Sequence, residues 1–143
     1  MKKIKFDTGL EEVVLGGGVL RFNPRDPNLF ARFEAAAGKM QAVEKDMVEK
    51  ARAAESDGLA VMKILQEADK AMKEILSWVF GAGNDFDTIL QGVNLLAVAS
   101  NGQRVVTNLF DALEPLLLEG AKCCAQHQAQ QAVEKAKARR AAK

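Results

Sequence analysis

Side chains that carry acid–base, nucleophilic and metal chemistry are scarce in this chain of 143 residues. It has one histidine, His127, and two adjacent cysteines, Cys123 and Cys124. Proton-transfer enzymes need titratable groups that converge on a pocket, and His127 has no acidic residue near it in the sequence. We therefore expect a protein without enzymatic activity, with His127 at the surface.

The same three residues are the only candidates for a metal site. Cys123 and His127 are four residues apart and share one face of an expected helix. A zinc site needs four protein ligands, or three and a water, so we expect neither metal nor cofactor and interpret Cys124 as a small buried apolar residue. Adjacent cysteines in a helix are poorly placed to pair with each other, which favours a reducing compartment, the cytoplasm.

Charge and hydropathy argue against two further classes of protein. The 20 basic residues nearly balance the 19 acidic ones, for a net charge of +1, whereas nucleic-acid binders usually carry a strongly basic domain. No apolar run reaches the roughly 18 residues of a membrane span, and residues 1–7 lack the apolar stretch of a secretory signal. We expect no membrane partner.

Residues 2–22 have the pattern of a small antiparallel sheet of two or three strands. Ile4 and Phe6 alternate with charged residues, as in a strand with one buried face. Two later apolar runs flank the glycines at 16–18, which can supply the positive backbone angles of a tight hairpin. A phosphate-binding loop would need a following helix and a Lys-Ser/Thr pair, and here a strand pattern follows.

The segment Asn23–Asn28 marks the change from strand to helix. Pro24 disfavours helical backbone in the residue before it, while Asp26 suits an N-cap and Pro27 the first turn of a helix. Apolar residues then recur at three- and four-residue steps, which predicts a helix over residues 28–54.

Residues 56–58, Ser-Asp-Gly, predict a break before a second helix. Between its apolar positions lies a charged face with intrahelical pairs such as Asp69–Lys73, which we expect to be solvated. Two helices joined by a short break predict an antiparallel helical hairpin. One continuous helix through Gly58 stays open, because a glycine costs a helix only about 1 kcal/mol. The apolar stripe consists of Val61, Leu65, Ala68, Met72, Ile75 and Val79.

Residues 81–85 contain glycines able to end this helix and an aspartate able to begin the next, a short helix over 87–91. The apolar segment 93–99 is expected to be buried. A helical pattern resumes at Gln103, and Pro115 within it should kink or restart the helix.

The predicted fold class is mainly α with a small N-terminal antiparallel hairpin (α+β), a helical hairpin and C-terminal helices. Residues 1–125 form one globular domain, with the β-hairpin in 2–22 and the helical body in 27–125. Residues 126–143 form a basic, alanine-rich tail that should be a frayed, solvated helix. Binding of nucleic acid through this tail is an alternative.

The region 80–117 carries more large apolar residues than one half of a small domain needs, and exposed apolar patches usually mark partner sites. The alternative is that all of them are core. The candidate partner-binding residues are Phe80, Phe86, Leu90, Phe110, Leu113 and Leu117.

Four segments in order carry a family resemblance: Leu20–Pro24, Asp26–Phe30, Trp78–Asn84 and Asn108–Leu117. With them, residues 1 to about 125 resemble the tail assembly chaperones of long-tailed bacteriophages and prophages. The basic tail after Gln126 departs from the short form of that family.

The resemblance implies a non-enzymatic protein in the cytoplasm of the bacterial host. Such chaperones keep the tape measure protein soluble and help to recruit tail tube subunits, so these two proteins are the implied partners, and a homo-oligomer is possible. An apolar groove between helices would accept amphipathic tape-measure helices, and flexible methionines would suit varied sequences. A structural or adaptor protein of the virion is the alternative, and a small nucleic-acid-binding protein a second one. The alternative is that these methionines are simply core; they are Met40, Met47, Met62 and Met72.

Overall fold

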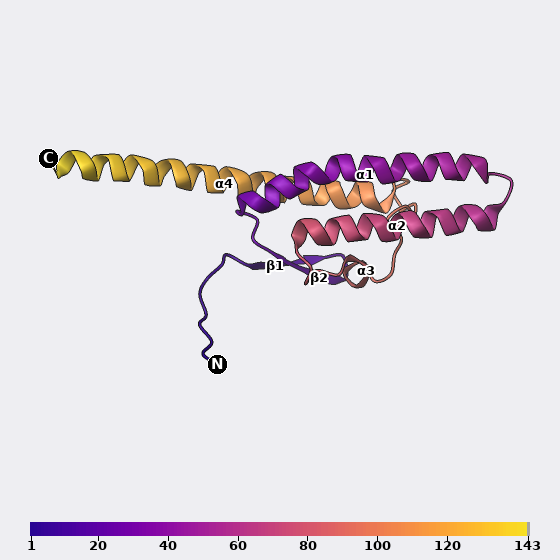
Figure 1. The fold of residues 1–143 in the computed structure, drawn as a ribbon, viewed down its shortest axis with the longest axis horizontal. Helices are drawn as coiled ribbons and strands as arrows, with labels where there is room; N and C mark the ends of the chain where they lie inside the picture. Colours follow the sequence, from indigo (N-terminus) through magenta and orange to yellow (C-terminus); the bar gives the residue numbers. More distant parts are fainter. Residues whose placement is uncertain (143) are drawn as a thin grey trace.

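The computed structural model describes residues 1–142, and it has the predicted fold class, mainly α with one N-terminal β-hairpin (Figure 1). Long helices α1 and α2 form an antiparallel pair, and the first part of α4 packs along it. The β-hairpin and the short α3 lie together beside the C-terminal end of α2. The elements are β1 (Glu11–Leu15), β2 (Gly18–Phe22), α1 (Pro27–Ala53), α2 (Gly58–Phe80), α3 (Phe86–Ile89) and α4 (Val105–Ala141).

The sheet has two strands, so the third strand considered for the N-terminus does not form. Strands β1 and β2 pair antiparallel from Glu11↔Phe22 to Leu15↔Gly18. Residues 1–10 contain no strand, and the side chains of Ile4 and Phe6 are 84% and 78% exposed. Alternation alone did not produce a strand because this segment has no neighbour to pair with.

The three glycines of the turn have different roles. Only Gly16 has a positive φ, 61°, which fits a two-residue turn of type II′ with glycine in its first position. Gly18 is needed for space instead. A Cβ on Gly18 would collide with the backbone of Ile89 in α3, whereas one on Gly17 would meet only the flexible end of the Gln91 side chain, which can move aside. The turn is therefore fitted against α3.

Local capping signals begin the helices where the sequence predicts. The Asp26 carboxylate accepts a hydrogen bond from the Asn28 backbone N–H at 2.9 Å at the start of α1. At the start of α2, the Asp57 carboxylate accepts one from the Ala60 N–H at 3.2 Å. The chain turns between the two helices, so the single continuous helix is excluded. Gly81, with φ 110°, ends α2 as predicted.

Asn84 joins the β-hairpin to the end of α2. Its side-chain oxygen accepts from the Arg21 backbone N–H at 2.9 Å, and its amide nitrogen donates to the Arg21 carbonyl at 2.8 Å. The same nitrogen donates to the Phe80 carbonyl at 2.9 Å, near the end of α2. The Asn84 amide thus makes the hydrogen bonds that a third strand would make to Arg21 of β2. Asn84 itself is only 6% exposed.

Helix α4 runs unbroken through Pro115, so the predicted restart does not occur. Pro115 is exposed, and the carbonyl that lacks its usual donor there can bind water, while Leu113 and Leu117 anchor the opposite face in the core. Further along, a Cβ on Gly120 would collide with the Pro24 carbonyl. Beyond this crossing the helix projects from the body (Figure 1), and every side chain from residue 125 to 142 is exposed.

The segment 93–99 is a loop that is buried only in part. Leu95 and Leu96 are core residues, whereas Val93 and Val98 are 45% and 73% exposed. The expectation that this apolar run is buried throughout is therefore wrong, because its side chains point in different directions along an irregular backbone. Among the described residues, no helix is long and apolar enough to cross a membrane.

Candidate functional site

The six predicted partner-binding residues lie mostly in the core. Four of them are 5% exposed or less, and two are half-buried. The ring of Phe80 lies between those of Phe22 and Phe86, with centroids 5.1 and 5.6 Å apart, and this cluster joins the sheet to α2 and α3. The buried four are Phe80, Phe86, Leu113 and Leu117, and the half-buried pair is Leu90 and Phe110.

As a result, these residues do not form one exposed face in the monomer. The ring of Phe110 contacts that of Phe33 of α1, with centroids 5.7 Å apart. A partner could reach the buried four only if the core opened. The methionines are divided in the same way: Met62 is 58% exposed, whereas Met40, Met47 and Met72 are buried.

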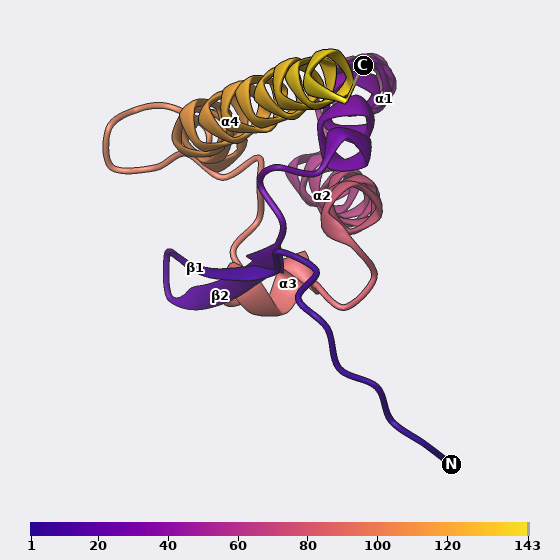
Figure 2. The same ribbon diagram turned by 90° about the vertical axis from the view of Figure 1, so that its left-hand side faces the viewer.

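One side of the α1–α2 pair is left uncovered. Viewed along the helices (Figure 2), α4, α3 and the β-hairpin all lie on the same side of the pair. Helix α4 also begins part-way along it, where Arg104 Nη1 lies 2.6 Å from the Glu44 carboxylate of α1. Within residues 1–142, no third helix therefore lies beside the two ends that meet at the Ser56–Gly58 turn.

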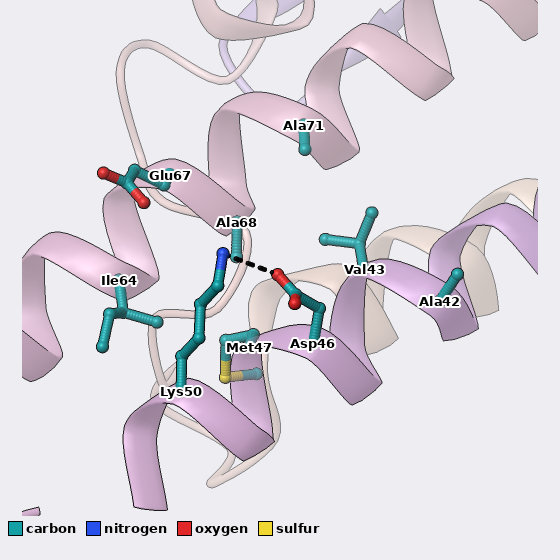
Figure 3. Close-up of a pocket in the computed structure, with 9 residues that line it drawn as sticks. All are labelled: Ala42, Val43, Asp46, Met47, Lys50, Ile64, Glu67, Ala68 and Ala71. Carbon is teal, nitrogen blue, oxygen red and sulfur yellow. Dashed lines mark ion pairs between the residues drawn. The ribbon is translucent and has the colours of Figure 1, made fainter. Parts of the chain in front are cut away.

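A groove lies between α1 and α2 on the uncovered side, and it extends from about the level of the Glu44–Arg104 pair toward the turn between the two helices. Its volume is about 390 Å³, and Figure 3 shows its lining. We call it the α1–α2 groove. It is lined by Ala42, Val43, Asp46, Met47 and Lys50 of α1 and by Ile64, Glu67, Ala68 and Ala71 of α2.

Small side chains create the groove. Ala42 on α1 and Ala68 and Ala71 on α2 face the space between the helices. Met47, which is 4% exposed, lies in the interface between the two helices, and Val43 is half-buried beside it. Leucine or phenylalanine at the alanine positions would occupy this space, so the groove follows from residue size.

Charges of both signs surround the groove. Lys50 extends from α1 across the opening (Figure 3), and its Nζ lies 2.9 Å from the Asp46 carboxylate one turn earlier. The hydrogen bond and the charge of Asp46 together raise the pKa of Lys50 above its ordinary value. Glu67 lies on the α2 side. The site therefore combines an apolar interior with a charged rim.

A second cluster lies on the other side of α2, where the sequence predicts a solvated face. The Lys73 side chain is only 7% exposed, and its Nζ lies 2.8 Å from Asp69 and 2.6 Å from Asp87. The Asp69–Lys73 pair is confirmed, but its expected solvation is wrong, because α3 and the following loop cover it. Asp69 also accepts a hydrogen bond from the Leu95 N–H at 2.7 Å.

The Lys73 ammonium is held in its charged form. Burial lowers the pKa of Lys73, but hydrogen bonds from the ammonium to Asp69 and Asp87, and the charges of these carboxylates, raise it by more. A hollow of about 510 Å³ next to the cluster is also lined by Glu74 and Asp85. A lysine fixed as a cation between two carboxylates is suited to joining α2 to α3 and the loop.

His127 is exposed, as predicted, and Cys123 is exposed while Cys124 is half-buried rather than buried. Within residues 1–142, no three His, Cys, Asp or Glu side chains are grouped so that they could hold a metal ion. Sequence reasoning placed Ala68 in the apolar stripe of the second helix, but it missed Ala42, Ala71 and the groove that the three alanines line. The available signal was Ala68 itself, a small residue that stands between Leu65 and Met72 in that stripe.

Comparisons with known protein families, with curated proteins and with solved structures found no match to this chain.

Proposed function

We propose that this protein is a tail assembly chaperone of a long-tailed bacteriophage or prophage, which binds helical segments of the tape measure protein in the α1–α2 groove. The observation that carries the proposal is the uncovered side of the α1–α2 pair, with an apolar groove and a charged rim. The order of hairpin and helices, which resembles that family, supports it.

An amphipathic helix fits such a groove in a defined way. A helix laid along the uncovered side of α1 and α2 would pack against both helices of the pair. Apolar side chains at three- and four-residue steps would enter between Ala42 and Ala71, each contributing about 1.5–3 kcal/mol when fully buried. Long helices that expose such stripes aggregate, so covering them keeps the partner soluble.

The charged rim can orient a bound helix without requiring a particular partner sequence. Lys50, Asp46 and Glu67 offer both signs of charge, all at the surface, where ion pairs contribute little affinity but steer orientation. The apolar interior accepts any side chain of suitable size. A chaperone that binds many segments of a long helical protein needs this combination.

The direct test places a carboxylate in the groove. Ala42→Glu combined with Ala71→Glu should weaken binding of helical peptides from the tape measure protein of the same genome by about tenfold or more, since an unpaired buried charge is costly. Ala112→Glu on the exposed side of α4 is the matched control. Isothermal titration measures binding, and an unchanged melting temperature shows that the fold is intact.

Undiminished binding by the double variant, or no binding by the unaltered protein, would contradict the proposal.

The alternative functions predict different outcomes. Detection of the protein in purified particles by mass spectrometry would favour a component of the virion. The exposed basic end of α4 favours the nucleic-acid alternative: it carries Lys135, Lys137, Arg139 and Arg140, and Lys143 lies outside the described residues. Deletion of residues 126–143 should leave peptide binding unchanged. If the deletion variant no longer bound the peptide, the binding function would lie in the tail.

A further inference from the structure

The β-hairpin has one closed edge and one open edge. The outward N–H and C=O of Arg21 on β2 both bond to Asn84. In an antiparallel pair, residues whose backbone groups point outward stand opposite each other, so Glu12, the partner of Arg21, and Val14 direct theirs away from β2. No described residue hydrogen-bonds to them there. Such an edge is a template for another strand.

The same chain carries a segment with a strand pattern and no partner. Residues 1–10 run away from the body (Figure 1, Figure 2). Ile4 and Phe6 are exposed apolar side chains that alternate with charged ones. Within residues 1–142, the first six residues form no hydrogen bond or ion pair and belong to no helix or strand. An open edge and a free strand-like segment thus occur together.

Residues 7–9 attach the base of this segment to the β2 side of its own hairpin. The Gly9 N–H donates to the Asp7 carboxylate at 2.7 Å, and Gly9 has a φ of 78°. Asn23, which follows β2, donates from its side-chain amide to the Thr8 carbonyl at 3.0 Å. These contacts lie on the β2 side of the chain, whereas the open edge of β1 faces the other way.

We propose that residues 2–6 of one copy pair antiparallel with the open edge of β1 in a second copy, and that the exchange is reciprocal, giving a two-fold symmetric dimer. Each copy supplies one segment and one edge, so two copies satisfy both. The proposal concerns the hairpin alone and is independent of the α1–α2 groove.

Hydrophobic pattern and charge select the same register. With Ile4 beside Val13, which faces the core side of the sheet, Lys5 stands beside Glu12. Lys3 then stands beside Val14, which is 77% exposed, and its aliphatic stem covers that side chain. A slip of one residue would move Ile4 to the solvent face and place Lys5 beside Val13.

The charges of the two elements are complementary. The segment carries Lys2, Lys3 and Lys5, and β1 begins with two glutamates. Glu12 is paired with Arg21 of its own chain at 2.8 Å, but its side chain is 65% exposed, so a lysine from a second copy can approach the same carboxylate. Opposite charges facing each other across strands are stabilising.

The test uses the full chain and measures its mass in solution by sedimentation and light scattering over a range of concentrations. We expect a dimer. Deletion of residues 2–6 should yield a monomer that keeps its helical circular dichroism, because these residues make no contact with the body of their own chain, and its melting temperature should no longer depend on protein concentration. A monomer at every concentration, a dimer that survives the deletion, or an open-ended series of oligomers would overturn the proposal.

Charge reversal tests the register. Lys5→Glu should weaken dimerisation by about tenfold, since it replaces attraction with repulsion across the strands. Glu12→Lys should do the same, and the double variant should restore dimerisation. Lys45→Glu, at an exposed position of α1, is the matched control and should have no effect. Failure of the double variant to recover would refute the pairing of Lys5 with Glu12. Peptide binding to the groove, measured on the deletion variant, should be retained, so the two proposals can fail separately.

Discussion

Replacing Asn84 by alanine should destabilise the fold more than its position in a short loop suggests. The side chain makes three hydrogen bonds of 2.8–2.9 Å, two with the Arg21 backbone and one with the Phe80 carbonyl, and it is 6% exposed. Alanine leaves the Arg21 N–H and both carbonyls without these partners in a place that water reaches poorly.

The magnitude follows from the number of bonds. A hydrogen bond contributes about 0.5–1.5 kcal/mol net, and a buried group left unpaired costs about 1–3 kcal/mol. We therefore expect Asn84→Ala to lower the free energy of unfolding by about 2–4 kcal/mol. Urea denaturation followed by circular dichroism measures this change, and each kcal/mol corresponds to roughly 3–5 °C in melting temperature for a chain of this size.

A second variant tests the direction of the bonds. Asn84→Asp keeps the shape but turns a donor toward the carbonyls of Arg21 and Phe80 into an acceptor, so it should be at least as destabilising at neutral pH. Its stability should rise relative to Asn84→Ala as the pH falls, because a protonated carboxyl can donate. Asn101→Ala, at an exposed position paired with Asn108, is the control and should change stability by less than about 1 kcal/mol. A change below about 0.5 kcal/mol for Asn84→Ala would refute the inference that its three hydrogen bonds hold the β-hairpin against α2.

Three further substitutions test other features. Lys73→Met should cost about 2–4 kcal/mol, because it leaves Asp69 without its buried partner. The pKa of Lys73 is raised in the folded state. The stability that its ion pairs add is therefore complete below the unfolded pKa of about 10.4 and is lost as the pH rises through the folded pKa. Unfolding measured at pH 8–11 should show this loss in the unaltered protein and not in Lys73→Met. Gly38→Ala, with open space around it, should stabilise α1 by about 0.5–1 kcal/mol in thermal unfolding. Gly120→Ala should instead destabilise by about 1–3 kcal/mol, because the added methyl group meets the Pro24 carbonyl. Equal effects of the two glycine substitutions would contradict the close crossing of α4.

The sequence predicts the helices well because their signals are local. Asp26 and Asp57 each cap a helix through a backbone N–H two or three residues away, so residue type and spacing are sufficient. The hairpin was predictable for the same reason, although only Gly16 of its three glycines has the predicted positive φ. The strand predicted around Ile4 and Phe6 failed because a strand also needs a neighbour.

Long-range contacts account for what was not predicted. Asn84 bonds to Arg21, 63 residues earlier, and Lys73 is buried only because the chain after α3 returns over α2. The apolar excess in residues 80–117 is largely core, because it must cover the sheet and α2 together. The groove arises where alanines of α1 and α2 meet, and a pattern of alanines in each helix does not show that they face each other.

Only the N-terminal part of α4 packs against the body, and this determines how its final part can unfold. The helix is nucleated within the body, where Leu109, Leu113 and Leu117 are fixed, so residues 126–141 extend an existing helix and do not have to start one. Fraying can then proceed only from the free end toward Gly120. Amide hydrogens should exchange in a gradient along this arm, fastest near Ala141, and limited proteolysis should shorten it stepwise and stop where the helix crosses Pro24.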